Sequence, residues 1–157
     1  MVALAASGLQ LELPAGWDGQ IRTVQDAPEA TAASRAGSTL PVILHAASFP
    51  LPAVRGDYGS GAVEVMGGSD ILVCLLEHEP EAAATALFRR QRLPQLSPDR
   101  FSPQSMQRAI AGMAGAQHFF QLSGRPFCLY VVIGSWATRG PLVRAADHVV
   151  QTIRIDA

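Results

Sequence analysis

The N-terminal part of the chain contains a strict alternation of apolar and polar residues. Leu9, Leu11 and Leu13 alternate with Gln10 and Glu12, which places the three leucines on one face of a half-buried strand. Further runs of β-branched, aromatic and other apolar residues are bounded by Gly, Pro or Ser, as strands commonly are. These runs predict strands at residues 19–24, 41–48, 71–77, 118–122 and 127–135.

Two of these predicted strands are apolar on both faces. Residues 71–76 and 127–133 carry apolar side chains at both alternating sets of positions. Strands of this kind are buried on both sides, so we expect the sheet to be covered either by two helical layers or, on one face, by a partner chain. The short connection at residues 123–126 contains Gly124, which predicts an antiparallel hairpin between the strands that flank it.

A change of period from two to 3.6 predicts a C-terminal helix at residues 142–153. Its apolar stripe consists of Leu142, Ala146, Val149, Val150 and Ile153. We also predict an alanine-rich helix at residues 80–90 and a shorter helix at residues 104–113. Residues 25–40 and 49–70 are rich in loop-forming residues. We predict a loop or a short helix at residues 25–40, and a short helix or a strand at residues 62–66 within the second segment.

The order of these elements predicts an α+β fold, because the strands occur in runs and do not alternate strictly with helices. The length of 157 residues and mass of 16.6 kDa fit one domain. No internal repeat or linker divides the chain. We therefore predict a single domain over residues 1–157 with an antiparallel sheet of about five to seven strands.

Composition excludes several classes of protein. Hydrophobic residues make up 48% of the chain and charged residues 16%, with a net charge of −1. These values exclude a disordered chain and argue against nucleic-acid binding through overall charge. The chain has no lysine and no asparagine, a bias that favours a GC-rich bacterial genome. Without lysine it has no Schiff-base nucleophile and no P-loop lysine.

The N-terminal sequence and the length of the apolar runs bear on localisation. Residues 1–7 lack the positive charge and the apolar length of a signal peptide. No apolar run approaches the ~20 residues that a membrane-spanning helix needs. We therefore expect a cytoplasmic protein without a membrane span.

Two terminal segments resemble those of a known superfamily. The segment GLQLELPAGW at residues 8–17 resembles the opening strand and P-x-G-W turn of the PsbP-like and DcrB-like domains. The segment AADHVVQTIRI at residues 145–155 resembles their closing helix and tail, and the paired strands around Gly124 fit the same order. The chain departs from the superfamily in its Gly-rich middle and in lacking a lipoprotein cysteine.

The resemblance implies a curved antiparallel sheet with helices packed on both faces. It also implies a binding function, because such domains include photosystem subunits, a nuclear-import factor, secretion-effector chaperones and cell-envelope proteins. The superfamily shares no catalytic constellation, so no catalytic residue follows from the resemblance.

The sequence shows no recognisable catalytic or metal-binding motif. The four histidines lack ligand spacing. In an extended strand Glu77 and Glu79 share one face and His78 lies on the other, so the three side chains cannot chelate one ion without a bend. No G-x-S-x-G segment is present. Cys74 and Cys128 lie within apolar runs, which fits two buried thiols or a disulfide between them. We predict no catalytic residue, no metal and no cofactor.

One basic cluster, formed by Arg89, Arg90 and Arg92, ends the helix predicted at residues 80–90. Cations at a helix C-terminus complement the helix dipole, so this cluster is either a solvated helix end or a contact for an anion. Three arginines are too few for a nucleic-acid footprint.

Apolar and aromatic residues fall where loops are expected, and such residues mark protein interfaces. They are either a surface for a partner or lids folded over the core. The candidate interaction residues are Phe49, Pro50, Leu51 and Pro52, together with Trp17, Tyr58 and Trp136 at predicted element ends.

Three functions remain in order of preference. The first is a non-catalytic protein-interaction module, chaperone-like or adaptor-like, whose partner is another protein or a second copy of the chain in a homodimer. The second is a carrier of a small apolar ligand held between sheet and helix. The third is an enzyme with a site around His45, Glu64 or His118.

Overall fold

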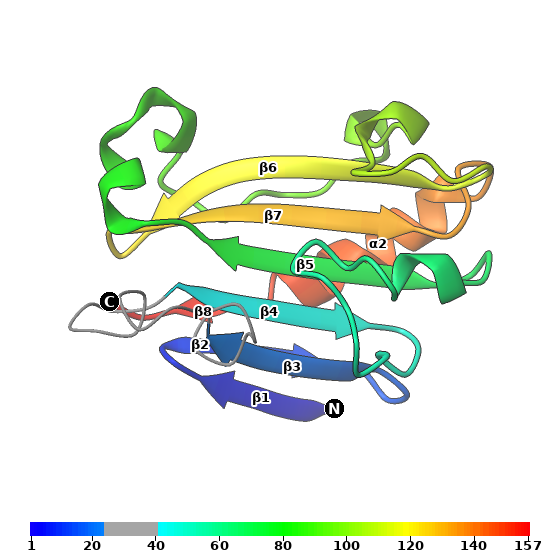
Figure 1. Cartoon of the computed structure of the whole chain (residues 1–157), viewed down its shortest axis with the longest axis horizontal. Helices are drawn as coiled ribbons and strands as arrows, with labels where there is room; N and C mark the ends of the chain where they lie inside the picture. The colour runs from blue at the N-terminus through cyan, green and yellow to red at the C-terminus, as the bar shows by residue number, and fades with distance from the viewer. Residues whose placement is uncertain (24–40) are drawn as a thin grey trace.

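The computed structural model describes residues 1–23 and 41–157, which form two antiparallel sheets and one α-helix (Figure 1). In the larger sheet the strand order is β3 (Asp18–Thr23), β4 (Val42–Ala47), β5 (Ile71–Glu77), β7 (Arg125–Ile133) and β6 (Ala114–Leu122). The smaller sheet has the order β1 (Val2–Ala6), β2 (Leu9–Leu13) and β8 (Arg154–Ile155). The α+β class and the antiparallel pairing are confirmed.

Two-residue turns close both hairpins. The β1–β2 turn has φ values of 53° at Ser7 and 80° at Gly8, and the β6–β7 turn has 55° at Ser123 and 75° at Gly124. Positive φ at both central positions is the type I′ geometry that matches the twist of paired strands. The predicted hairpin is confirmed, although its turn is shorter than the four residues expected and β6 starts earlier, at Ala114.

The first face of the larger sheet is covered by helix α2 (Arg139–Val150) and by the inward leucines of β2. From the helix, Val143, Ala146, Val149 and Val150 are buried in this first-face core. Figure 1 shows α2 behind the sheet, across β5 and β7. The predicted C-terminal helix is confirmed with shifted bounds, and Ile153 stays in the core beyond its end.

The second face is covered by loops, so the expectation of helices on both faces is wrong. Residues 49–66 and 106–113 lay apolar side chains over the outward side of β5 and β7, with only the short 3₁₀ helix η2 (Val63–Val65) among them. Figure 1 shows no clear curl of the sheet as a whole. The second-face core consists of Ala47, Phe49, Ala62, Val63, Leu72, Cys74, Leu76, Met113, Tyr130 and Val132.

The helices predicted at residues 80–90 and 104–113 are wrong. The first segment contains two short 3₁₀ helices, η3 (Pro80–Ala84) and η4 (Ala86–Phe88), because Thr85 between them is extended. The second contains only η6 (Pro103–Ser105), which follows another 3₁₀ turn, η5 (Pro98–Arg100).

Two further differences concern the N-terminal part of the chain. Strand β1 (Val2–Ala6) was not expected, because its run of small apolar residues has no polar alternation. The loop or short helix predicted at residues 25–40 lies outside the described residues. None of the helices in the described part of the chain has the length and apolar character to cross a membrane.

Candidate binding groove at the outer edge of strand β6

Strand β6 is the last strand of the larger sheet, and its outer edge is protected at two points. At one end Ser102 and Gly115 exchange two backbone hydrogen bonds, both of 3.0 Å. At the other end the Gln121 amide donates to the Arg90 carbonyl at 2.8 Å. Exposed strand edges invite pairing with another chain, and such covering contacts suppress it.

Between these two contacts the edge is open. In an antiparallel pair, alternate residues bond to the partner strand and the others direct their N–H and C=O groups outward. Gly115 and Gln121 direct their backbone groups away from β7, as their contacts show. Gln117 and Phe119 lie between them at alternate positions, so their N–H and C=O groups also point outward. No described backbone group pairs with the outward groups of Gln117 and Phe119.

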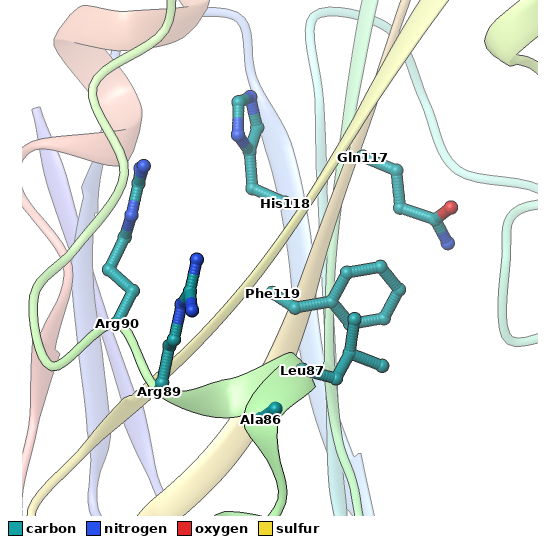
Figure 2. A pocket seen from close by; sticks show the side chains of 7 residues that line it. All are labelled: Ala86, Leu87, Arg89, Arg90, Gln117, His118 and Phe119. Atoms are coloured by element: carbon teal, nitrogen blue, oxygen red, sulfur yellow. The ribbon is translucent and has the colours of Figure 1, made fainter.

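A groove of about 580 Å³ lies along this open edge, between β6 and the segment that contains η4. Figure 2 shows the side chains of Arg89, Arg90 and His118 on one side of the β6 ribbon. The side chains of Gln117 and Phe119 lie on the other side, together with Leu87 (Figure 2). The groove is lined by Ala86, Leu87, Arg89, Arg90, Gln117, His118 and Phe119.

The His118 side of the groove is positively charged. Arg89 and Arg90 are exposed, and the ion pairs among the residues described, Arg22–Asp57 and Arg125–Glu77, involve neither of them. An anion that entered the groove would therefore meet guanidinium groups that no carboxylate of residues 1–23 or 41–157 neutralises in an ion pair.

The ring of His118 has a nitrogen without a hydrogen-bond partner among the described residues. Its Nε2 atom is buried without a hydrogen bond, the one such side-chain atom among the described residues. Burial, followed by the charges of Arg90 and Arg100, lowers the pKa of His118. A buried polar atom without a hydrogen bond costs free energy, so a ligand that forms a hydrogen bond with His118 Nε2 would remove that cost.

The opposite side of the groove is apolar. Leu87 is 57% exposed although it is a large apolar residue. Phe119 is half-buried and packs edge-on against the ring of Phe88, with centroids 5.6 Å apart. The two sides therefore offer different chemistry, charged beside His118 and apolar beside Phe119.

Gln121 positions the wall of the groove. Its side-chain amide donates to the carbonyl oxygens of Ala83 at 2.8 Å and of Phe88 at 2.7 Å. Phe88 is buried, which anchors the segment that carries Leu87 and Arg89. The groove is consequently held open by a hydrogen-bonded wall and a buried aromatic anchor.

The predicted loop at residues 49–52 lies on the second face and does not line the groove. Phe49 is only 8% exposed and is part of the second-face core, as the lid alternative expected. Leu51 packs against the same core, Pro50 is exposed, and Pro52 accepts a hydrogen bond from Arg55 through its carbonyl.

None of the three other predicted aromatic residues lines the groove. Tyr58 packs edge-on against Tyr130 in the second-face core, with centroids 5.7 Å apart. Trp17 and Trp136 are half-buried against the first-face core. The Arg139 guanidinium lies 3.9 Å from the Trp136 ring centroid, a cation–π contact.

Of the predicted arginine cluster, Arg89 and Arg90 line the groove and Arg92 does not. Sequence reasoning missed Leu87, Gln117 and Phe119 as groove residues. No local pattern could have identified them, because the open edge depends on which strand is outermost in the sheet.

His45 lies in a separate buried network on the second face. Its Nδ1 accepts a hydrogen bond from Arg55 Nε at 2.7 Å, which leaves Nε2 to donate to the Asp57 carbonyl at 2.6 Å. Burial lowers the pKa of His45 from 6.5 to about 4, with Arg55 lowering it further and the Asp57 carbonyl opposing. This neutral histidine ties the loop around Asp57 to β4.

Among the described residues, the cysteines and acidic side chains form no metal-binding cluster with the histidines. Cys74 and Cys128 are both free and buried, and burial raises the pKa of each thiol. Within residues 1–23 and 41–157, no group of three His, Cys, Asp or Glu side chains is arranged to hold a metal ion.

Comparison with known proteins gave no relative: no family model, no curated protein and no solved structure matches the chain.

Proposed function

We propose that the protein is an interaction module that binds an extended segment of a partner protein by adding it as a strand to the outer edge of β6. The observation that supports this function is the open stretch of edge at Gln117 and Phe119, bordered by the contacts of Gly115 and Gln121. In strand addition, backbone hydrogen bonds provide affinity and side-chain pockets provide specificity.

The dimensions of the groove support a short segment. The contacts at Gly115 and Gln121 leave residues 116–120 between them, which corresponds to about 17 Å at roughly 3.4 Å per residue. A partner segment of about three to five residues fits this length, and its central residues would hydrogen-bond to Gln117 and Phe119.

Strand addition accounts for the structure better than carriage of an apolar ligand between sheet and helix. That space is filled by the side chains of the first-face core, including Val143, Ala146 and Val149 of α2. The groove at β6 is open to solvent and charged on one side, which suits a peptide rather than a wholly apolar compound.

The test uses a matched pair of substitutions at Gln117. Gln117→Pro removes the outward N–H and leaves the bonds of β6 to β7 in place, since proline is tolerated at an edge strand when its nitrogen faces solvent. Gln117→Ala keeps the N–H but loses the same side chain, including its hydrogen bond to Cys128 Sγ. The two variants therefore separate backbone pairing from side-chain contact.

Peptides are selected on the wild-type protein from a displayed random library and measured by fluorescence anisotropy. We expect Gln117→Ala to bind them within about twofold of the wild type and Gln117→Pro to bind at least about tenfold more weakly. Methylation of a peptide nitrogen whose N–H bonds to the edge of β6 should abolish binding. Methylation at the next residue, whose N–H points away from β6, should leave binding intact. Equal binding by both variants, or a library without binders, would refute strand addition.

A further inference from the structure

The two sides of the groove differ in chemistry, and strand addition would place successive side chains of the bound segment on opposite sides. Residues directly opposite each other in paired strands have their side chains on the same face of the sheet. A segment residue opposite His118 therefore shares the face with Arg89 and Arg90. Its two neighbours, opposite Gln117 and Phe119, share the face with Leu87 (Figure 2).

The face with His118 selects a negative charge. Arg89 and Arg90 line it and form no ion pair with a carboxylate in the described part of the chain. The positive charge of Arg100 also lowers the pKa of His118. Guanidinium groups bind carboxylate and phosphate oxygens through short, charge-assisted hydrogen bonds. His118 adds a ring whose Nε2 atom has no hydrogen-bond partner among the described residues.

The other face selects apolar side chains. Exposed Leu87 and half-buried Phe119 leave apolar surface in contact with water. Covering this surface gains roughly 25 cal/mol for each Å² buried. The side chains that flank the charged residue of the segment would supply that cover.

We propose that the β6 groove selects a segment with the pattern apolar–acidic–apolar, in which the central side chain carries a carboxylate or phosphate bound by Arg89 and Arg90 beside His118. This inference rests on the strand addition proposed above and names the chemistry of the segment that is added. The partner is thus a protein with an exposed, extended acidic segment.

Three labelled peptides test the pattern: Thr-Val-Glu-Val-Thr, Thr-Val-Gln-Val-Thr and the same sequence with phosphoserine at the centre, each blocked at both ends. The proteins are the wild type, Arg89→Gln, Arg90→Gln and the control Arg92→Gln, which removes an exposed arginine that does not line the groove. Circular dichroism checks that each variant is folded.

We expect the wild type to bind the Glu peptide at least about tenfold more tightly than the Gln peptide. Arg89→Gln and Arg90→Gln should each remove most of that preference and leave binding of the Gln peptide within about twofold. Arg92→Gln should change neither. Phosphoserine binding more tightly than Glu would identify a phosphorylated source, and the reverse order would identify a carboxylate source.

A second readout follows the His118 ring by NMR, assigned with a His118→Gln variant. Both peptides bury the His118 ring further, but only the Glu peptide brings an anion that offsets the charges of Arg90 and Arg100, so the pKa of His118 should be higher in the Glu complex than in the Gln complex. Inorganic phosphate alone should move the same ring signals, and Arg90→Gln should weaken that effect.

The results separate this inference from the function on which it rests. Equal affinity for the Glu and Gln peptides, with the same His118 pKa in both complexes, would overturn anion selection, while strand addition would stand on the Gln117 pair. Failure of all three peptides to bind would also overturn the proposed pattern. Loss of the difference between Gln117→Pro and Gln117→Ala would overturn both proposals.

Discussion

The ion pair between Arg125 and Glu77 joins several elements at one end of the molecule, and we expect its loss to be costly. Arg125 Nε and NH2 donate to the two carboxylate oxygens of Glu77 at 2.8 and 3.0 Å, and Arg125 NH1 donates to the Asp156 carbonyl at 2.9 Å. Glu77 also accepts from the Val42 amide at 3.0 Å. The contact thus connects β5, β7, β4 and the C-terminal tail.

The magnitude follows from burial. The side chains of Arg125 and Glu77 are 14% and 8% exposed, and removing one member of a buried pair leaves the other charge uncompensated. Glu77→Gln should therefore lower the free energy of unfolding by about 3 kcal/mol, the lower end of the usual range, because Arg125 keeps the Asp156 carbonyl. The exposed pair Arg22–Asp57 provides the control, since its carboxylate is 54% exposed.

Urea unfolding followed by circular dichroism measures both variants. Asp57→Asn should cost less than about 1 kcal/mol and lose even that at high salt, whereas the cost of Glu77→Gln should persist. The urea slope should be unchanged, because neither substitution alters the surface exposed on unfolding. Equal costs for the two variants would refute the argument from burial.

Three further predictions concern packing and pH. Gly134→Ala should prevent correct folding, because the added Cβ would lie 1.9 Å from the Gly67 carbonyl oxygen. Gly68→Ala should be tolerated, because a Cβ added at Gly68 would meet no atom within 4 Å. Soluble yield and thermal unfolding compare the two variants. Phe49→Ala should cost about 3–5 kcal/mol in urea unfolding, because Phe49 belongs to the second-face core, and a cost below about 1 kcal/mol would contradict that packing. The free energy of unfolding should fall by up to about 3 kcal/mol as pH drops from about 6.5 to about 4, because His45 binds a proton in the unfolded chain over this range but stays neutral in the folded protein. His45→Gln should lose this part of the pH dependence, and a variant with the same pH profile as the wild type would contradict the prediction.

Strands with a clear period or a long apolar run could be predicted from the sequence. The alternation at residues 9–13 and the doubly apolar runs in β5 and β7 correctly indicated strands, because each pattern directly reflects which faces are buried. The helix α2 was predicted from its stripe for the same reason, although the stripe omitted buried Val143 and included Ile153, which lies beyond the end of the helix. Strand β1 gave no such signal, because most of its residues are exposed.

The false helix at residues 80–90 shows where local propensity fails. Its alanines favour a helix. However, the carbonyl oxygens of Ala83 and Phe88 accept hydrogen bonds from the side chain of Gln121, and the carbonyl oxygen of Arg90 accepts one from the backbone N–H of Gln121. These tertiary bonds draw the segment along the edge of β6. Propensity within the segment contains no information about a partner more than 30 residues away in the chain.

The candidate site was predictable only in part. The cluster of Arg89 and Arg90 was visible in the sequence as either a solvated helix end or a contact for an anion, but its placement beside His118 depends on the fold. The open edge at Gln117 and Phe119 depends on the strand order and on two covering contacts, neither of which has a local signature.

Amide hydrogen exchange, measured by NMR with and without the Thr-Val-Glu-Val-Thr peptide, tests the outward backbone groups of β6 most directly. In the free protein the amides of residues 116, 118 and 120, which bond to β7, should exchange slowly, and those of Gln117 and Phe119 rapidly. At a saturating peptide concentration, Gln117 and Phe119 should become protected while the other three stay slow. Unchanged rapid exchange at both amides with peptide bound would contradict strand addition at this edge.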